Sequence, residues 1–302
     1  MFEHIKIFTL RAAFSAKEKG TLPPYLGSTI RGILGHCIRE FVCQKPKTKC
    51  FMCERRDNCL YVKCFSNTGK EGGAVNPYTL HVLIDGKTEW NVGDECVFDL
   101  KLFGSATEQI GVYLDALLAM ERKGWGVNRI PFQLVRITEA ETGTLIYAGG
   151  KTWMRNLIPH SMSVGEKTAK TAMIRFDTPL RIVTGKNLCH SISFETLIRF
   201  ISRRISLISQ IYTEHRIEWN EEAIIEQAER IQVCEEQFRL VDFHRYSLNQ
   251  KGNRLDLPAI EGWAVFDGDL TELTPILEAG KYFHVGKGAT IGFGHYEVFY
   301  DR

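Results

Sequence analysis

A cluster of cysteines near the N-terminus has the spacing of metal ligands. Five of the nine cysteines lie between Cys43 and Cys64, and Cys50, Cys53 and Cys59 follow the pattern C-x2-C-x5-C. Three thiolates at this spacing suit a tetrahedral metal site, and the fourth ligand is Cys43 or Cys64. A structural zinc would stabilise a segment with too few apolar residues for a core of its own. An iron–sulfur cluster and unligated reduced thiols are the alternatives.

A glycine-rich segment near the C-terminus is the second candidate for chemistry. It carries Gly286, Lys287, Gly288, Gly292 and Gly294. Glycines allow positive φ and a close approach to a ligand, and successive N–H groups with Lys287 can bind an anion. The segment leads into a strand and lacks a G-K-[ST] ending, which excludes dinucleotide and Walker-type phosphate loops. The alternative is a glycine-rich hairpin needed only for folding.

Composition indicates a globular protein of two domains. The chain has 302 residues, 44% of them hydrophobic and 25% charged, with a net charge of +2. This charge balance means that a nucleic-acid site must come from local clusters of Lys and Arg. The sequence has no long apolar run and no signal-peptide pattern at its start, so we expect a cytoplasmic protein without a membrane span.

The elements that must position these residues follow one order twice, β-α-β-β-α-β, which is the ferredoxin-like pattern. In the first half, alternation and helical periodicity predict elements at about 4–14, 28–41, 78–84, 96–103, 107–122 and 132–137. In the second half they predict elements at about 171–176, 193–214, 237–247, 260–267, 270–279 and 295–300, with an additional acidic helix at about 220–236. We therefore predict an α+β protein with two tandem ferredoxin-like domains. Residues 1–158 form the first, with a cysteine-rich insertion at 43–65, and residues 166–302 form the second.

Two separate stretches of the chain resemble one known family. Residues 285–297 (VGKGATIGFGHYE) resemble the C-terminal signature of the CRISPR-associated pre-crRNA-processing endoribonucleases of the repeat-associated mysterious protein (RAMP) superfamily. Residues 22–32 (LPPYLGSTIRG) and the cysteine pair at 50–53 resemble the N-terminal part of that family. The resemblance implies cleavage of CRISPR repeat RNA without a metal ion, through attack of a 2′-hydroxyl that leaves a 2′,3′-cyclic phosphate. It also implies other CRISPR effector subunits as partners.

The resemblance also suggests roles for single residues. The family often has a histidine in its first helix, and His36 is the matching residue here. On a helical projection His36 points away from the apolar stripe, with Arg39 and Gly32 on its face. A solvated histidine beside helix-packing glycines is the alternative.

The other implied roles are in substrate binding. Tyr25 would orient a substrate group, and Arg31 or Arg39 would hold a phosphate. Independently of the resemblance, helical spacing puts Arg199 and Arg203 on the exposed side of the long C-terminal helix, with Arg204 beside them, and we expect them to contact the RNA backbone from there. The glycine-rich segment would position the RNA. For the metal site, the resemblance favours Cys43 as the fourth ligand.

Two other functions remain open at the level of the sequence. A RAMP subunit that binds guide RNA without cutting it is the first. A zinc-ribbon nucleic-acid adaptor unrelated to the family is the second.

Overall fold

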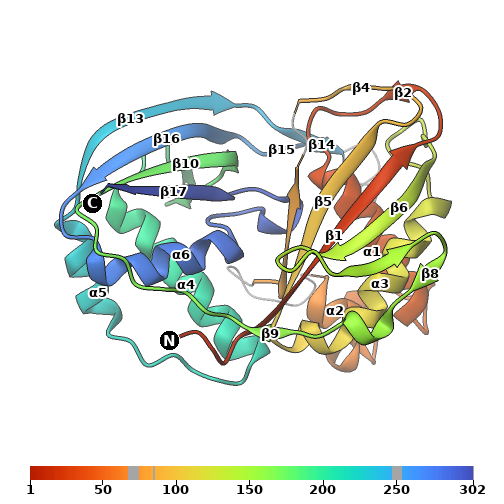
Figure 1. Cartoon of the computed structure of the whole chain (residues 1–302), viewed down its shortest axis with the longest axis horizontal. Helices are drawn as coiled ribbons and strands as arrows, with labels where there is room; N and C mark the ends of the chain where they lie inside the picture. Colours follow the sequence, from red (N-terminus) through yellow and green to blue (C-terminus); the bar gives the residue numbers. More distant parts are fainter. Residues whose placement is uncertain (67–74, 84–85, 247–253, 302) are drawn as a thin grey trace. The chain divides into compact units, whose positions relative to one another are not determined.

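The structure is a computed structural model that describes residues 1–66, 75–83, 86–246 and 254–301 (Figure 1). The chain divides into two compact units. One is Glu3–Met162, called here the N-terminal unit, and the other is Ser163–Arg302 together with Met1–Phe2, called here the C-terminal unit.

The N-terminal unit is built on an antiparallel sheet with helices packed on it (Figure 1). The strand order β3-β5-β1-β6 places the first and third strands of the β-α-β-β-α-β unit at the centre. Its six elements are β1 (Lys6–Ala16), α1 (Gly27–Val42), β3 (Tyr78–Val82), β5 (Glu95–Phe103), α3 (Ile110–Ala119) and β6 (Phe132–Glu139). The sheet continues from β6 through β7 (Leu145–Ala148) and β8 (Lys151–Thr152), while β9 (His160–Ser161) pairs with β1.

Strand β1 is the centre of this unit because it pairs on both edges. On one face Phe8, Leu10 and Phe14 are fully buried, whereas the other face mixes apolar residues with Thr9, Arg11 and Ser15. The rings of Trp125 and Phe132 stack 4.3 Å apart beside Phe14, which fills the core near one end of the sheet.

Between α1 and β3 the chain forms the cysteine-rich insertion. It contains the short 3₁₀ helices η1 (Cys50–Met52) and η2 (Arg56–Asn58) and the helix α2 (Leu60–Cys64). The remaining short elements of the unit are β2 (Gly20–Thr21), β4 (Glu89–Trp90), η3 (Gly104–Gln109), η4 (Met120–Arg122) and η5 (Met154–Asn156).

The C-terminal unit repeats the same order with strand order β13-β16-β10-β17. Its six elements are β10 (Thr171–Leu180), α4 (Phe194–Tyr212), β13 (Gln232–Val241), β16 (Ala259–Asp267), α6 (Thr274–Phe283) and β17 (Tyr296–Asp301). The chain therefore has the predicted α+β fold of two tandem ferredoxin-like domains. Additional elements are β11 (Val183–Thr184), β12 (Asn187–Leu188), α5 (Glu221–Glu229), β14 (His244–Tyr246), β15 (Arg254–Asp256), η6 (Thr271–Leu273) and η7 (Ala289–Ile291).

The long helix α4 forms where its sequence predicts it. Ser193 caps the first turn by accepting a hydrogen bond from the Thr196 N–H at 3.1 Å. Its apolar stripe is buried and packs against α6, where Gly280 allows a close approach to Ile201.

The predicted end of the acidic helix was wrong. The acidic helix ends at Glu229, and the residues that follow form β13. Nearly all side chains of β13 are exposed, so this strand shows none of the apolar alternation that identifies a strand.

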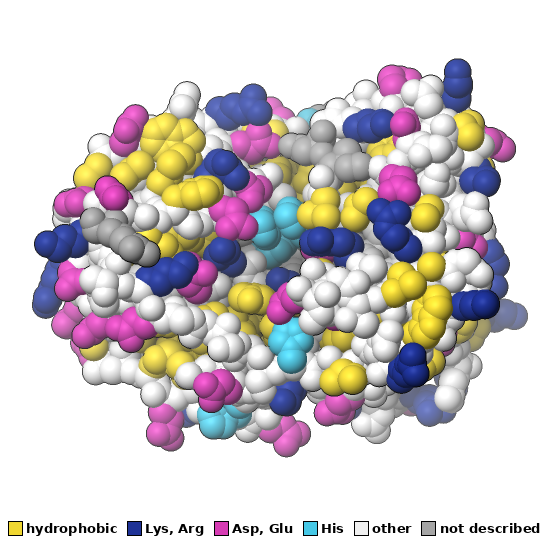
Figure 2. Space-filling model, in the orientation of Figure 1, with side chains coloured by type: hydrophobic (Ala, Val, Ile, Leu, Met, Phe, Trp, Pro, Cys, Tyr) yellow, Lys and Arg dark blue, Asp and Glu magenta, His cyan; other side chains and the backbone are white. Residues whose placement is uncertain are grey.

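No helix in the described part of the chain combines the length and apolarity that crossing a membrane requires. On the face drawn in Figure 2, Lys and Arg side chains are interspersed with Asp and Glu, as the small net charge suggests.

Candidate functional site

The glycine-rich loop at 286–294 is a tightly packed turn. Gly286, Gly288, Gly292 and Gly294 all have positive φ, between 75° and 95°. A Cβ on Gly286 would lie 2.5 Å from the carbonyl oxygen of Arg181, and one on Gly294 would collide with the carbonyl of Val285. The glycines are therefore required for folding at these positions.

The backbone donors of this loop are largely used inside the protein. The N–H groups of Lys287 and Gly294 donate to the carbonyls of Arg181 (2.7 Å) and Pro179 (2.9 Å), and that of Gly292 donates to Ala289 (3.0 Å). The expectation that successive N–H groups of the loop bind an anion is therefore wrong for these three N–H groups. What the loop presents outward is the exposed side chain of Lys287.

Arg204 lies beneath the loop and not on the outer face of α4. Its guanidinium donates to the carbonyl oxygen of Gly286, and burial lowers the pKa of Arg204 to about 10. The group therefore stays a cation at neutral pH while it ties α4 to the loop. We predicted that Arg204 lies beside Arg199 and Arg203, and this was wrong. Each residue of a helix is rotated by about 100° from the one before, so Arg204 faces inward although Arg203 faces outward.

The two neighbouring arginines do lie on the outer face of α4. Arg203 is exposed, and Arg199 is exposed and forms an ion pair of 2.5 Å with Glu195, four residues earlier. Solvent screens such a pair, so Arg199 can exchange Glu195 for a phosphate at small cost.

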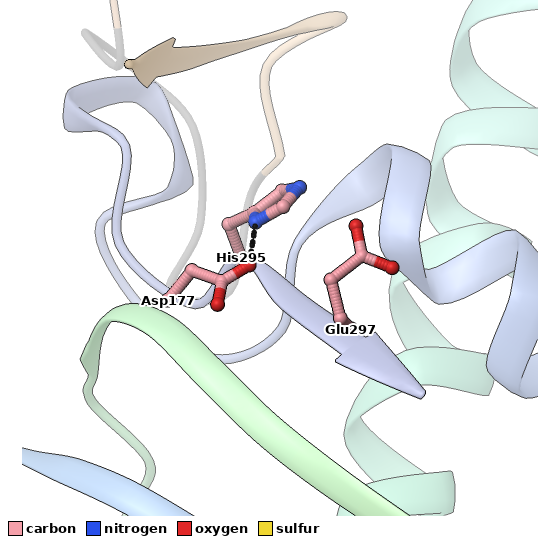
Figure 3. A group of neighbouring side chains, drawn as sticks. All are labelled: Asp177, His295 and Glu297. Atoms are coloured by element: carbon pink, nitrogen blue, oxygen red, sulfur yellow. Dashed lines mark ion pairs between the residues drawn. The ribbon is translucent and has the colours of Figure 1, made fainter. Parts of the chain in front are cut away.

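A histidine and two carboxylates meet beside the loop, a group that the sequence did not predict (Figure 3). One ligand atom from each of Asp177, His295 and Glu297 lies within 4.8 Å of the others. The pairing of β10 with β17, with Arg175 opposite Glu297, brings these residues together across the sequence. The one signal in the sequence was the position of His295 directly after the loop.

The charges of this group are already balanced by protein cations. Nδ1 of His295 lies 3.3 Å from Asp177, which also pairs with Arg175 at 3.0 Å. Lys281 pairs with Glu297 at 2.8 Å. Burial raises the pKa of Asp177, but its interactions with His295 and Arg175 outweigh this and hold the pKa below its usual value. The arrangement is an ion-pair network, and a metal ion would have to displace Arg175 and Lys281.

His36 lies on an open part of α1. Its side chain is exposed, and a Cβ placed on Gly32, one turn earlier, would meet nothing within 4 Å. Gly35 differs, because the ring of Phe65, the residue that follows α2, occupies the space where its Cβ would be. The structure thus explains Gly35 by packing and leaves the face of Gly32 and His36 accessible.

The predicted phosphate ligands of this helix are engaged with the insertion. The Arg31 guanidinium lies 4.8 Å from the centre of the Phe65 ring. Arg39 donates to the carbonyl of Pro46 at 3.0 Å. Tyr25, just before α1, is partly buried. The structure therefore places His36 outward and directs Arg31 and Arg39 toward neighbouring residues of the protein.

Four cysteines of the insertion surround one small cavity. Cys43, Cys50, Cys53 and Cys59 line a space of about 20 Å³, with Lys45, Thr48, Arg56, Tyr61 and Val62 around it. Cys64 is not part of it, because its side chain is buried in the hydrophobic core of the N-terminal unit. Burial raises the pKa of Cys50, Arg39 lowers it, and the three neighbouring thiols raise it further.

Two models of known protein families match two different parts of the chain. A family model described as an N-terminal domain matches residues 5–160, about half of the chain. The model of the CRISPR-associated endoribonuclease Cas6 matches residues 174–296. A protein of Archaeoglobus fulgidus described as uncharacterized is 23% identical over 290 residues, which covers 92% of each chain.

Solved structures share the fold at low sequence identity. Two structures of one Cas6 protein, from Thermus thermophilus, one of them a product complex, have TM-scores of 0.57 and 0.56. They are 15% and 13% identical, and the superpositions cover 97% and 98% of this chain and 100% and 99% of theirs. A chain of a partial Cas6-RT-Cas1–Cas2 complex has a TM-score of 0.63 at 10% identity. The match covers 98% of this chain but only 46% of that one, so this chain spans less than half of its length.

Proposed function

We propose that this chain is a Cas6-type endoribonuclease that cleaves CRISPR repeat RNA without a metal ion, and the match of residues 174–296 to the model of the CRISPR-associated endoribonuclease Cas6 supports this proposal. The 2′-hydroxyl at the cleavage site attacks the adjacent phosphorus, the bond to the 5′-oxygen breaks, and a 2′,3′-cyclic phosphate remains. The reaction needs a base for the hydroxyl proton, an acid for the leaving oxygen and a cation for the phosphorane charge.

One observation carries the proposal: His36 is an exposed imidazole on a helix face that Gly32 leaves open. An RNA backbone can approach this face closely. Imidazole takes up and releases a proton near neutral pH, so His36 can act on the 2′-hydroxyl or on the 5′-oxygen. Tyr25 would orient a substrate group, and Arg31 or Arg39 would have to give up a protein contact to hold the phosphate.

A second function has a specific observation in its favour. Arg31 and Arg39, the cations nearest to His36 on α1, are both engaged with Phe65 and Pro46. A protein that binds guide RNA without cutting it needs no cation at the phosphorane. A partnership with other CRISPR proteins, of the kind named for the Cas6-RT-Cas1–Cas2 complex, is likewise a proposal for this chain.

Incubation of the purified protein with its cognate repeat RNA in EDTA separates the two functions. We expect cleavage with cyclic-phosphate ends, and a rate lower by about 10²- to 10⁴-fold in His36→Ala with RNA affinity unchanged. His190→Ala, which removes another exposed histidine, is the matched control.

Intact RNA that the wild-type protein binds tightly would instead favour the non-catalytic function. Full activity in His36→Ala would keep the reaction and reject His36 as its proton carrier.

A further inference from the structure

The cysteine-rich segment at 43–59 has no apolar interior. In this segment only Cys43, Thr48, Cys50, Cys53 and Cys59 are partly enclosed, and every other residue is exposed. Its two large apolar side chains point outward, with Phe51 58% and Met52 70% exposed. The thiols thus occupy the position that apolar side chains occupy in an ordinary small fold. Ordering such a segment without a core is unfavourable, because backbone entropy is lost with little burial in return.

The backbone presents each thiol from a defined turn. Cys50 and Cys53 begin and follow η1, where the Cys53 N–H donates to the carbonyl of Cys50 at 3.2 Å. The Cys59 N–H donates to Arg56 at the end of η2, and the Cys43 N–H donates to Arg39 at the end of α1. Three separate turns therefore direct four sulfurs at one cavity large enough for a single ion.

An unpaired guanidinium nitrogen supplies an independent indication. Nε of Arg39 is buried and has no acceptor within the described residues. Arg39 contacts the segment directly, because its carbonyl accepts from the Cys43 N–H at 2.9 Å and its guanidinium donates to the carbonyl of Pro46 at 3.0 Å. A buried donor without an acceptor is unfavourable, and a metal-bound thiolate is an acceptor of the right charge. Lys45 and Arg56, which also line the cavity, would offset the remaining negative charge of a four-thiolate site.

We propose that Cys43, Cys50, Cys53 and Cys59 bind one structural zinc ion. Four thiolates at about 2.3 Å from zinc lie about 3.8 Å from one another. The thiols are more widely spaced here, since among the described residues the group already within 4.8 Å is that of Asp177, His295 and Glu297. Zinc would draw the turns together and release the thiol protons. The site is independent of the proposed nuclease chemistry.

Zinc content tests the site directly. The purified full chain is loaded with zinc, freed of loose metal with a weak chelator, and assayed for metal and for reactive thiols. We expect one zinc per chain, lost in Cys50→Ser plus Cys53→Ser and retained in Cys189→Ser plus Cys234→Ser, the matched control outside the segment.

Cobalt then identifies the fourth ligand. Tetrahedral cobalt bound by thiolates shows thiolate-to-metal charge-transfer absorption, which we expect to weaken in Cys43→Ser and to stay unchanged in Cys64→Ser. The proposal would be overturned if the absorption weakened in Cys64→Ser and not in Cys43→Ser. It would also be overturned by an iron–sulfur spectrum, by disulfides among the four cysteines, or by a wild-type protein that binds no zinc. Circular dichroism verifies that the serine variants are folded, and the wild-type zinc content decides the question if they are not.

Hydrogen exchange supplies a readout that does not depend on activity. Arg39 joins the segment to the end of α1 through Pro46. We therefore expect removal of zinc to speed amide exchange in segment 43–59 and in the last turn of α1, with no change in α4. Equal exchange with and without zinc would contradict a structural role.

Discussion

At the scale of single residues, Asp177 is the clearest case of a charge held in place by its neighbours. Arg175 and His295 both act on its carboxylate and keep its pKa below the usual value. A carboxyl group with a lowered pKa in the folded state stabilises the fold at pH values above its unfolded pKa. That contribution disappears as the pH falls through the lowered value.

We therefore predict that Asp177→Asn lowers stability at pH 7 by about 1 kcal/mol, a modest figure because solvent screens this partly exposed group. For a domain of this size that corresponds to a fall of about 2–4 °C in the melting temperature. The difference from wild type should shrink as the pH falls below the ordinary range of an aspartate pKa and through the lowered pKa of Asp177, because the wild-type carboxylate then becomes protonated. Melting curves over a pH series test this, with Asp242→Asn as an exposed control. A difference that is constant with pH would mean that the effect is not electrostatic.

The residue scale also shows what spacing in the sequence can and cannot reveal. Cys50 and Cys53 are close in the chain, so local turns alone are enough to place both at the same cavity. Asp177 and His295 are far apart in the chain and meet only because β10 pairs with β17. The position of Arg204 was predicted wrongly because its partner, the Gly286 carbonyl, lies 82 residues later in the chain. Contacts of this kind depend on the tertiary fold and cannot be read from periodicity.

At the scale of elements, helix α1 carries two glycines with different surroundings. Alanine is favoured over glycine within a helix by about 1 kcal/mol. At Gly32 the added methyl group meets nothing, whereas at Gly35 it collides with the ring of Phe65. We predict that Gly32→Ala raises the melting temperature by about 2–4 °C and that Gly35→Ala lowers it, since overpacking costs about 1–3 kcal/mol.

The same pair of variants tests whether RNA approaches this face. If the substrate contacts α1 beside His36, Gly32→Ala should slow cleavage although it stabilises the fold. Gly35→Ala, whose methyl group points at Phe65, should affect RNA cleavage only through stability. A stabilised and fully active Gly32→Ala would place the substrate elsewhere.

Element positions were predictable where one face of the element is buried. The stripe of α4 and the alternation of β5 identify them because both elements bury one face and expose the other. Strand β13 lies at an edge of its sheet, and both of its faces are largely exposed. Its first residues were therefore wrongly predicted to belong to the acidic helix that precedes it.

At the scale of the whole molecule, the repeated β-α-β-β-α-β order was sufficient for the fold. It specifies the antiparallel strand order in both units, with the first and third strands at the centre. Net charge gave much less information about function. Because the charge is only +2, the proposed affinity for RNA would depend on a few cations in particular places.

Salt dependence can count those cations. Each phosphate contact to single-stranded nucleic acid contributes about 0.7 to the slope of log affinity against log salt concentration. We predict that Lys287→Ala and Arg203→Ala each reduce the slope for repeat RNA by about 0.7, and that the double variant reduces it by about 1.4. The measurements are made in the His36→Ala background, so that the RNA stays intact.

Arg216→Ala is the matched control, because it removes an exposed arginine of the same unit outside the predicted RNA-binding set. Arg204→Ala should behave differently from all of these. Its guanidinium supports the loop through Gly286, so its loss should lower the melting temperature of the protein as well as its affinity for RNA. If the slope falls equally in Arg216→Ala and in Lys287→Ala, the glycine-rich loop holds no phosphate, and its four glycines serve only the packing of the loop against residues 179–182 and Val285.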